Sequence, residues 1–184
     1  MEWAFDGGRP CLDLVNTLRS RHSTGVELLT GPDALAEWLS LAGFTAGPVP
    51  VTAGNVLAAK ALREAVDRVL LPAGAPAEMD IELVNNAAAS APSPPPRLVL
   101  ADGVLRRDVP APKDPVAAAF AALAADAIDL AAGDASVREC AADDCGLRFC
   151  DASPRRNRQW CSMSRCGNRA KARAHYARVS GREE

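Results

Sequence analysis

The stretch Cys140-Ala-Ala-Asp-Asp-Cys145, followed after fifteen residues by Cys161-Ser-Met-Ser-Arg-Cys166, decides the fold of the C-terminal part of this 184-residue chain. Two cysteine pairs separated by one loop suit tetrahedral zinc, because each pair supplies one edge of the tetrahedron. Four sulfur ligands leave no open coordination position, so the sequence predicts one structural Zn²⁺. A module this small buries little apolar surface, and we expect metal binding to supply on the order of 10 kcal/mol of its folding free energy.

Two further residues near this cluster compete for the ligand positions. Cys150 lies between the two pairs, beside Phe149, and is expected to be a small buried apolar residue. The alternatives are that Cys150 replaces one of the four ligands or is a redox-sensitive thiol. His175 lies nine residues past Cys166, too far along the expected helix to be favoured as a ligand.

The sequence before the cysteines predicts packed helices. Hydrophobic residues make up 48% of the chain and aromatic residues only 4%, and abundant alanine favours helix over sheet. Apolar periodicity together with proline and glycine positions predicts helices at about 10–21, 30–42, 52–71, 77–90 and 115–132. Thr30 is expected to cap the second of these helices.

Two β-prone runs, 97–100 and 104–109, flank Ala101-Asp102-Gly103, which is a hairpin signal. The fold expected is therefore mainly α. A helical N-terminal domain with one small β-hairpin, at 1–135, is expected to serve sensing or dimerisation. A zinc finger at 136–184, made of a β-knuckle and a C-terminal helix, follows the polar break at 133–136.

The compartment expected from the sequence is the cytoplasm. The chain has no run of about 18 apolar residues, so no membrane contact is expected. The N-terminus carries two acids within six residues and has no basic region followed by an apolar stretch, unlike a signal peptide. Five of the six cysteines lie between 140 and 166, and such clustering in a reducing compartment indicates metal binding.

Charge is distributed unevenly along the chain, although the net charge is only −2. Residues 138–184 hold 11 Lys and Arg against 6 Asp and Glu, and nine basic residues with no acidic one lie between 155 and 182. Arginine, which makes up eight of these nine, suits bidentate contact with phosphate or guanine. The sequence therefore predicts a surface for nucleic acid, with a protein-docking surface or a solvated charged helix as alternatives.

The residues expected to contact nucleic acid form two groups, a loop before the C-terminal helix and the helix itself. They are Arg155, Arg156, Arg158, Arg165, Arg169, Lys171 and Arg173. Phe149 and Trp160 are expected to form the small core of the finger, whereas Tyr176 remains open as a base-stacking residue.

The stretch 158–171, which contains Cys166-Gly167-Asn168-Arg169, resembles the CGNR zinc finger family, named for those four residues. The run Cys11-Leu-Asp-Leu-Val-Asn-Thr17 resembles the ABATE-type domain that precedes this finger in stress-induced transcriptional regulators. The resemblance implies a bacterial transcriptional regulator in which Cys140, Cys145, Cys161 and Cys166 bind zinc and the finger binds DNA. Cys150 departs from the family, which more often has an ordinary apolar residue there.

The N-terminal domain offers fewer chemical signals. Asp13, Asn16 and Arg19 are polar residues near an apolar helix stripe and are a possible pocket for an unknown small ligand, with surface or capping roles as the alternative. We find no phosphate-binding loop and no nucleophile–base set, so the chain is not expected to be an enzyme. A thiol- or metal-dependent enzyme using Cys150 or Cys11 is the weaker alternative, and a homodimer is expected because one finger gives little specificity.

Overall fold

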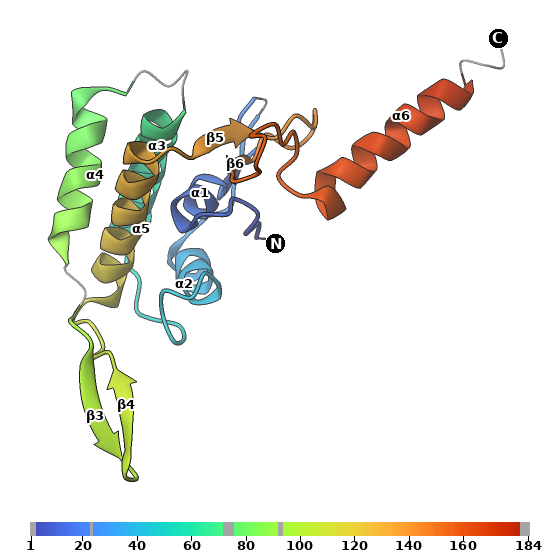
Figure 1. Ribbon diagram of the computed structural model, residues 1–184. Coiled ribbons are helices and arrows are strands. Elements are labelled where there is room, and N and C mark those ends of the chain that lie inside the picture. The colour runs from blue at the N-terminus through green and yellow to red at the C-terminus, as the bar shows by residue number, and fades with distance from the viewer. Residues whose placement is uncertain (1–2, 23, 72–75, 92–93, 181–184) are drawn as a thin grey trace.

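The computed structural model describes residues 3–22, 24–71, 76–91 and 94–180, with the side chains of 174–175 and 177–180 outside the description. Five helices form the N-terminal domain (Figure 1). They are α1 (Pro10–Val15), α2 (Pro32–Leu41), α3 (Ala53–Leu70), α4 (Glu78–Ser90) and α5 (Pro115–Ala132). The mainly helical class predicted from the sequence is confirmed.

The helical core is organised around α3, α4 and α5, which pack against one another, with α1 lying against α3 and α5. Its largest fully buried side chain is Trp38 of α2, which stacks between Phe5 and Phe44 at centroid distances of 6.4 and 6.1 Å. Four alanines and two leucines of α5 are buried, and the small alanine side chains allow the helices to approach closely.

Local sequence sets the ends of the long helices. Thr52 and Asn55 form a reciprocal capping box at the start of α3, and the Asp114 carboxylate accepts hydrogen bonds from two backbone N–H groups at the start of α5. Helix α2 differs from the prediction: its N-cap is Gly31, without a side-chain hydrogen bond, and Thr30 does not cap it.

The first helix is shorter than predicted. It ends at Val15 instead of about residue 21, and the chain continues into β1 (Leu18–Arg19), which pairs with β2 (Val26–Glu27) in a short antiparallel hairpin. The prediction of a single hairpin in the N-terminal domain was therefore incomplete. The apolar spacing that suggested a longer helix continues only to Leu18, whose side chain is half-buried on β1.

The predicted hairpin is present as β3 (Arg97–Ala101) and β4 (Val104–Asp108), joined by a turn in which Asp102 and Gly103 both have positive φ.

Helix α5 is long and apolar enough to cross a membrane by length and composition, with a mean hydropathy of 1.6. This helix was not recognised as a candidate span from the sequence, because only uninterrupted apolar runs were considered, and Asp126 and Asp129 interrupt this one. Here its apolar side chains pack into the helical core.

The finger consists of β5 (Ser136–Glu139), β6 (Arg148–Asp151), a π-helical turn (Met163–Gly167) and α6 (Asn168–Ser180). It packs directly on the helical domain, since β6 contacts α1 and the Cys150 N–H donates to the Gly7 carbonyl at 2.8 Å. Figure 1 shows α6 and the β3–β4 hairpin extending away from this body in different directions.

Candidate metal centre and basic surface

The four predicted ligand cysteines converge at one point. Cys140 and Cys145 lie in the connection between β5 and β6, Cys161 precedes the π-helical turn, and Cys166 lies within it. Their four Sγ atoms all lie within 4.8 Å of one another, and the Sγ of Cys161 is 3.7 Å from those of both Cys145 and Cys166. A tetrahedron with metal–sulfur bonds of about 2.3 Å has sulfur–sulfur edges of about 3.8 Å. The cluster therefore fits a single zinc ion.

Backbone hydrogen bonds fix the two halves of this cluster. The Cys140 N–H donates to the Leu147 carbonyl at 2.8 Å, and the Ala141 N–H donates to the Gln159 carbonyl at 2.8 Å, which ties the first cysteine pair to the segment before the second. Gly146 supplies the positive φ, +65°, that the chain needs between Cys145 and β6.

The second cysteine pair is set by a tight helical turn. Ser162 caps it: its side chain accepts a hydrogen bond from the Arg165 N–H, and its carbonyl accepts one from the Cys166 N–H at 3.0 Å. A Cβ at Gly167 would lie 2.5 Å from the Met163 sulfur and 3.4 Å from the Trp160 ring. A side chain at this position would therefore require the end of the Met163 side chain, which is 47% exposed, to move aside.

The proximity of the thiols changes their acidity. Hydrogen bonding from Cys161 lowers the pKa of Cys145 to about 5, and burial raises the pKa of Cys166 to about 11. Hydrogen bonding to Cys145 raises the pKa of Cys161 as well. These shifts favour the thiolate form of Cys145 and the protonated forms of Cys161 and Cys166. Binding of a divalent cation therefore has to displace those protons.

Cys150 lies outside the ligand cluster. It is half-buried on β6, and its side chain packs against the helical core rather than against the other cysteines. Its backbone pairs with Val137 across the hairpin. This position accounts for Cys150 as an apolar packing residue. The side chain of His175 lies outside the described residues.

The finger has a small core of its own around the cysteines. Phe149 and Ala4, which comes from the N-terminal segment, are buried in this core. Trp160 is partly buried and packs against the cluster. The Arg158 guanidinium lies 4.7 Å from the centre of the Phe149 ring and donates to the carbonyls of Trp160 and Cys161. Arg158, expected at the nucleic-acid surface, therefore also closes the finger core.

Three of the arginines that were expected to contact nucleic acid form ion pairs with acidic side chains. Arg165 pairs with Asp6 at 2.9 Å, and Arg169 and Arg173 both pair with Asp144, at 2.9 and 3.1 Å. Although burial opposes its ionisation, these two arginines lower the pKa of Asp144. The sequence shows no acid near them in the chain, because Asp144 comes from the knuckle and Asp6 from the N-terminal segment.

Arg169 also contacts the metal centre, with its Nη2 atom 3.6 Å from the Cys166 Sγ. Four thiolates and one Zn²⁺ carry a net charge of −2, so a guanidinium beside the sulfur offsets part of that charge. Arg169 is thus in part a positioning residue for the zinc site.

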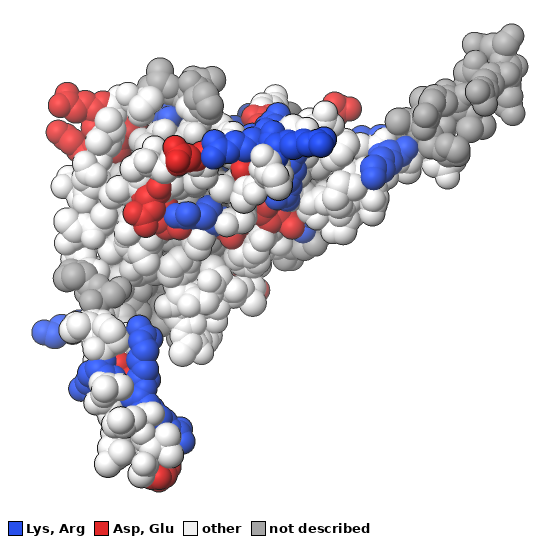
Figure 2. All heavy atoms as spheres, viewed as in Figure 1, with Lys and Arg blue, Asp and Glu red and all other residues white. Residues whose placement is uncertain are grey.

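The other basic residues that were expected to contact nucleic acid face solvent. Within the described residues, Arg155, Arg156 and Lys171 are exposed and form no ion pair. Figure 2 shows Lys and Arg side chains gathered over the finger, between the helical domain and α6. Tyr176 on α6 is 70% exposed, and its side chain lies on a helix that contacts mainly the π-helical turn.

The three residues expected to line one pocket are not brought together. The Asp13 Oδ1 accepts a hydrogen bond from the Gly7 N–H at 2.9 Å, and Asn16 is buried against β6. Of these three residues, Arg19 alone borders a cavity, which has a volume of about 360 Å³. The cavity is lined by the β1–β2 hairpin and by Asp144, Cys145, Arg165 and Arg169 of the finger.

Asn16 has instead a role that sequence reasoning missed. Its side-chain amide donates to the Arg148 carbonyl at 2.9 Å, and its Oδ1 accepts from the Arg148 N–H at 2.8 Å. The side chain of Asn16, the C-cap residue of α1, thereby hydrogen-bonds the backbone of β6 as a neighbouring strand would, and it joins the helical domain to the finger.

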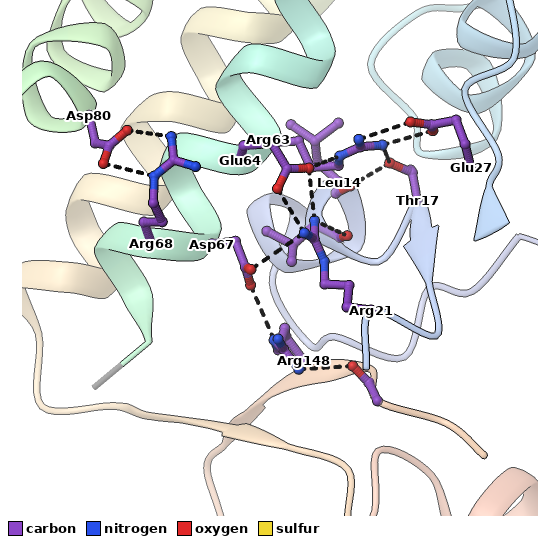
Figure 3. Close-up of polar contacts among 12 residues, drawn as sticks. Leu14, Thr17, Arg21, Glu27, Arg63, Glu64, Asp67, Arg68, Asp80 and Arg148 are labelled. Atoms are coloured by element: carbon purple, nitrogen blue, oxygen red, sulfur yellow. Dashed lines mark hydrogen bonds and ion pairs between the residues drawn. The ribbon is translucent and has the colours of Figure 1, made fainter. Parts of the chain in front are cut away.

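A partly buried ion network continues this junction (Figure 3). The Arg148 guanidinium bonds Asp67 of α3 at 3.1 Å and Glu139 of β5 at 2.5 Å, and Asp67 also lies 3.6 Å from Arg21. Arg148 is only 5% exposed. The sequence signal that could have indicated it is an arginine placed within the otherwise apolar run Leu147 to Cys150.

Comparison with protein families gives two matches. The ABATE family model, described as "Putative stress-induced transcription regulator", matches residues 8–134, and the CGNR zinc finger model matches residues 136–179. A search of curated proteins gave no match. The first model covers more than half of the chain, and the second contains the complete cysteine cluster.

Proposed function

Because the chain belongs to the ABATE family and ends in a CGNR zinc finger, we propose that it regulates transcription by binding DNA through that finger. The family description names a regulator, and neither matching family is an enzyme family. A protein that acts on bacterial DNA works in the cytoplasm, which agrees with the reduced cysteines of the metal site.

The observation that carries this proposal is the exposed helix α6. Its described contacts with other elements are mainly with the π-helical turn that holds Cys166, so the metal centre fixes where the helix begins. The helix has no apolar face to bury, since its first six residues are Asn-Arg-Ala-Lys-Ala-Arg. A projecting helix that is polar all round has little packing energy and suits a polar partner.

In this proposal two groups of basic residues contact different parts of the DNA. Arg155, Arg156 and Lys171, which make no ion pairs among the described residues, are the candidates for phosphate contacts. Arg169 and Arg173 are oriented by Asp144, and this leaves donors on each guanidinium fork for a phosphate or a base edge. The loop 155–158 and the start of α6 flank the metal centre, so one duplex could meet both.

The test is the salt dependence of binding to a random-sequence DNA duplex, measured by fluorescence anisotropy with the zinc-loaded full-length chain. If Arg155 and Arg156 each neutralise one phosphate, the variant Arg155→Gln/Arg156→Gln lowers the slope of log K against log salt by about 1.8. The matched control is Arg106→Gln/Lys113→Gln, which changes the net charge equally on exposed residues remote from the finger.

The control is expected to keep the slope of the parent protein. Equal losses in both variants would mean that affinity follows overall charge, which contradicts binding through the finger. Binding that is insensitive to salt, or absent, would also contradict the proposal and would favour the finger as a docking surface for protein.

A further inference from the structure

The β3–β4 hairpin, residues 97–108 and hereafter the arm, is an unusual feature of this chain. Among the residues that the structure describes, its two strands pair only with each other, over five residue pairs from Arg97–Asp108 to Ala101–Val104. Figure 1 shows the arm extending away from the helices, joined to them by the segments after α4 and before α5. Each strand therefore has one open edge.

One face of the arm is built from leucines. Leu98 lies opposite Arg107, and Leu100 lies opposite Leu105. Residues opposite each other share a face and side chains alternate along a strand, so Leu98, Leu100 and Leu105 point to the same side. Their exposed fractions are 73%, 71% and 67%.

An arm of this kind is poorly stabilised by itself. A two-stranded hairpin is marginally stable in water, and it becomes stable when more strands or a packed hydrophobic face are added. Contiguous exposed leucines and open strand edges are also the features through which proteins associate. We therefore expect the leucine face to be covered by an apolar surface.

We propose that a second copy of this chain covers the arm, with the leucine faces of the two arms packed against each other about a two-fold axis. The charges of the arm support this partner. Arg97, Arg106 and Arg107 are opposed by Asp102 and Asp108, so the arm carries a net charge of only +1, and Arg97 already pairs with Asp108 at 2.7 Å. A net charge this small does not favour a polyanion. Arg107 shares the leucine face but lies at its end away from the turn, so two antiparallel arms would place their Arg107 side chains at opposite ends of the contact.

The area of the contact is sufficient. Covering three leucines and their neighbours on both arms would remove on the order of 1,000 Å² from water, near the smallest size of specific interfaces. The arm lies far along the chain from the zinc ligands and from α6 and projects in another direction (Figure 1). Association through the arm would leave both fingers accessible, and the inference stands whether or not the finger binds DNA.

Sedimentation equilibrium of the zinc-loaded full-length chain over roughly a hundredfold range of concentration tests this inference. We expect a monomer–dimer equilibrium. The variant Leu98→Thr/Leu100→Thr introduces β-branched, strand-compatible side chains but removes the apolar face, and is expected to weaken the dimer at least tenfold. The matched variant Val99→Thr/Val104→Thr changes the opposite face and is expected to leave the dimer nearly unchanged.

A second measurement locates the contact. In a Cys150→Ser background, Leu100→Cys is expected to form a disulfide-linked dimer under mild oxidation with oxygen, whereas Val99→Cys is not. A chain that stays monomeric at all concentrations, or a dimer that both double variants weaken equally, would overturn the proposal. A dimer that persists in Leu98→Thr/Leu100→Thr with unchanged affinity would overturn it as well.

Discussion

Replacing Asn16 with alanine tests whether one buried side chain joins the helical domain to the finger. Asn16 is 3% exposed and satisfies both the N–H and the carbonyl of Arg148, itself 5% exposed. In Asn16→Ala both backbone groups lose their partner. Each buried polar group left unsatisfied costs about 1–3 kcal/mol, so we expect the free energy of unfolding to fall by about 4 kcal/mol.

A loss of this size is a large part of the 5–15 kcal/mol that typically separates folded from unfolded protein. Urea unfolding followed by tryptophan fluorescence measures it, and the chain has a reporter on each side of the junction. Trp38 lies in the helical core and Trp160 in the finger. Because the domains share this junction, we expect a single transition in which zinc also becomes accessible to a chelator earlier than in the parent protein.

The control is Asn55→Ala, which removes an exposed asparagine from the capping box of α3 and should lower the free energy of unfolding by about 1 kcal/mol. If Asn16→Ala costs no more than Asn55→Ala, the side chain does not hold β6 against α1. A finger that still unfolds together with the helices in that case would be joined by other contacts, and the reasoning would be refuted.

Three further predictions follow from single contacts. Cys161→Ser should lose the zinc while Cys150→Ser keeps one zinc per chain, as measured by metal analysis after gel filtration. Burial raises the pKa of Asp13 to about 7, above its unfolded value, so the folded state binds the proton more tightly and the free energy of unfolding falls as pH rises from about 4 to about 7. Asp13→Asn, which can still accept from Gly7, should flatten that dependence in urea titrations. Glu27→Ala leaves the buried Arg63 without its two-point partner at 2.8 and 2.9 Å and should cost about 3 kcal/mol in the same assay.

The parts of the fold that the sequence predicted well are those that local signals determine. The bounds of α3 and α5 follow from capping side chains at Thr52 and Asp114 and from helix-favouring alanines. The hairpin at 97–108 follows from Asp102-Gly103, which tolerates positive φ at both positions. The cysteine cluster was indicated by the spacing of the two cysteine pairs and by the resemblance to the CGNR zinc finger.

The parts that the sequence did not predict depend on distant contacts. Helix α1 ends at Val15 because Asn16 is used by β6, which lies more than 130 residues later in the chain. A periodicity count within one helix cannot contain that information. The same applies to Arg19, whose expected neighbours Asp13 and Asn16 are engaged elsewhere, while finger residues surround it.

The basic surface also could not be predicted fully from the sequence. Nine basic residues without an acid between 155 and 182 indicated a basic surface, in which Arg165, Arg169 and Arg173 of the helix were expected to contact nucleic acid. Folding brings Asp144 and Asp6 to three of them, so the number of cations available for phosphate is smaller than the sequence count. Charge counts along a chain overestimate a binding surface whenever acids from other segments fold beside it.

The central claim is that four sulfur atoms from Cys140, Cys145, Cys161 and Cys166 close a zinc site from which the basic helix starts. Zinc K-edge X-ray absorption on the purified full-length chain measures this directly. We predict four sulfur scatterers at about 2.3 Å and no nitrogen or oxygen neighbour. A first shell that requires a nitrogen or oxygen ligand, or a preparation that is fully folded with no bound zinc, would contradict the account.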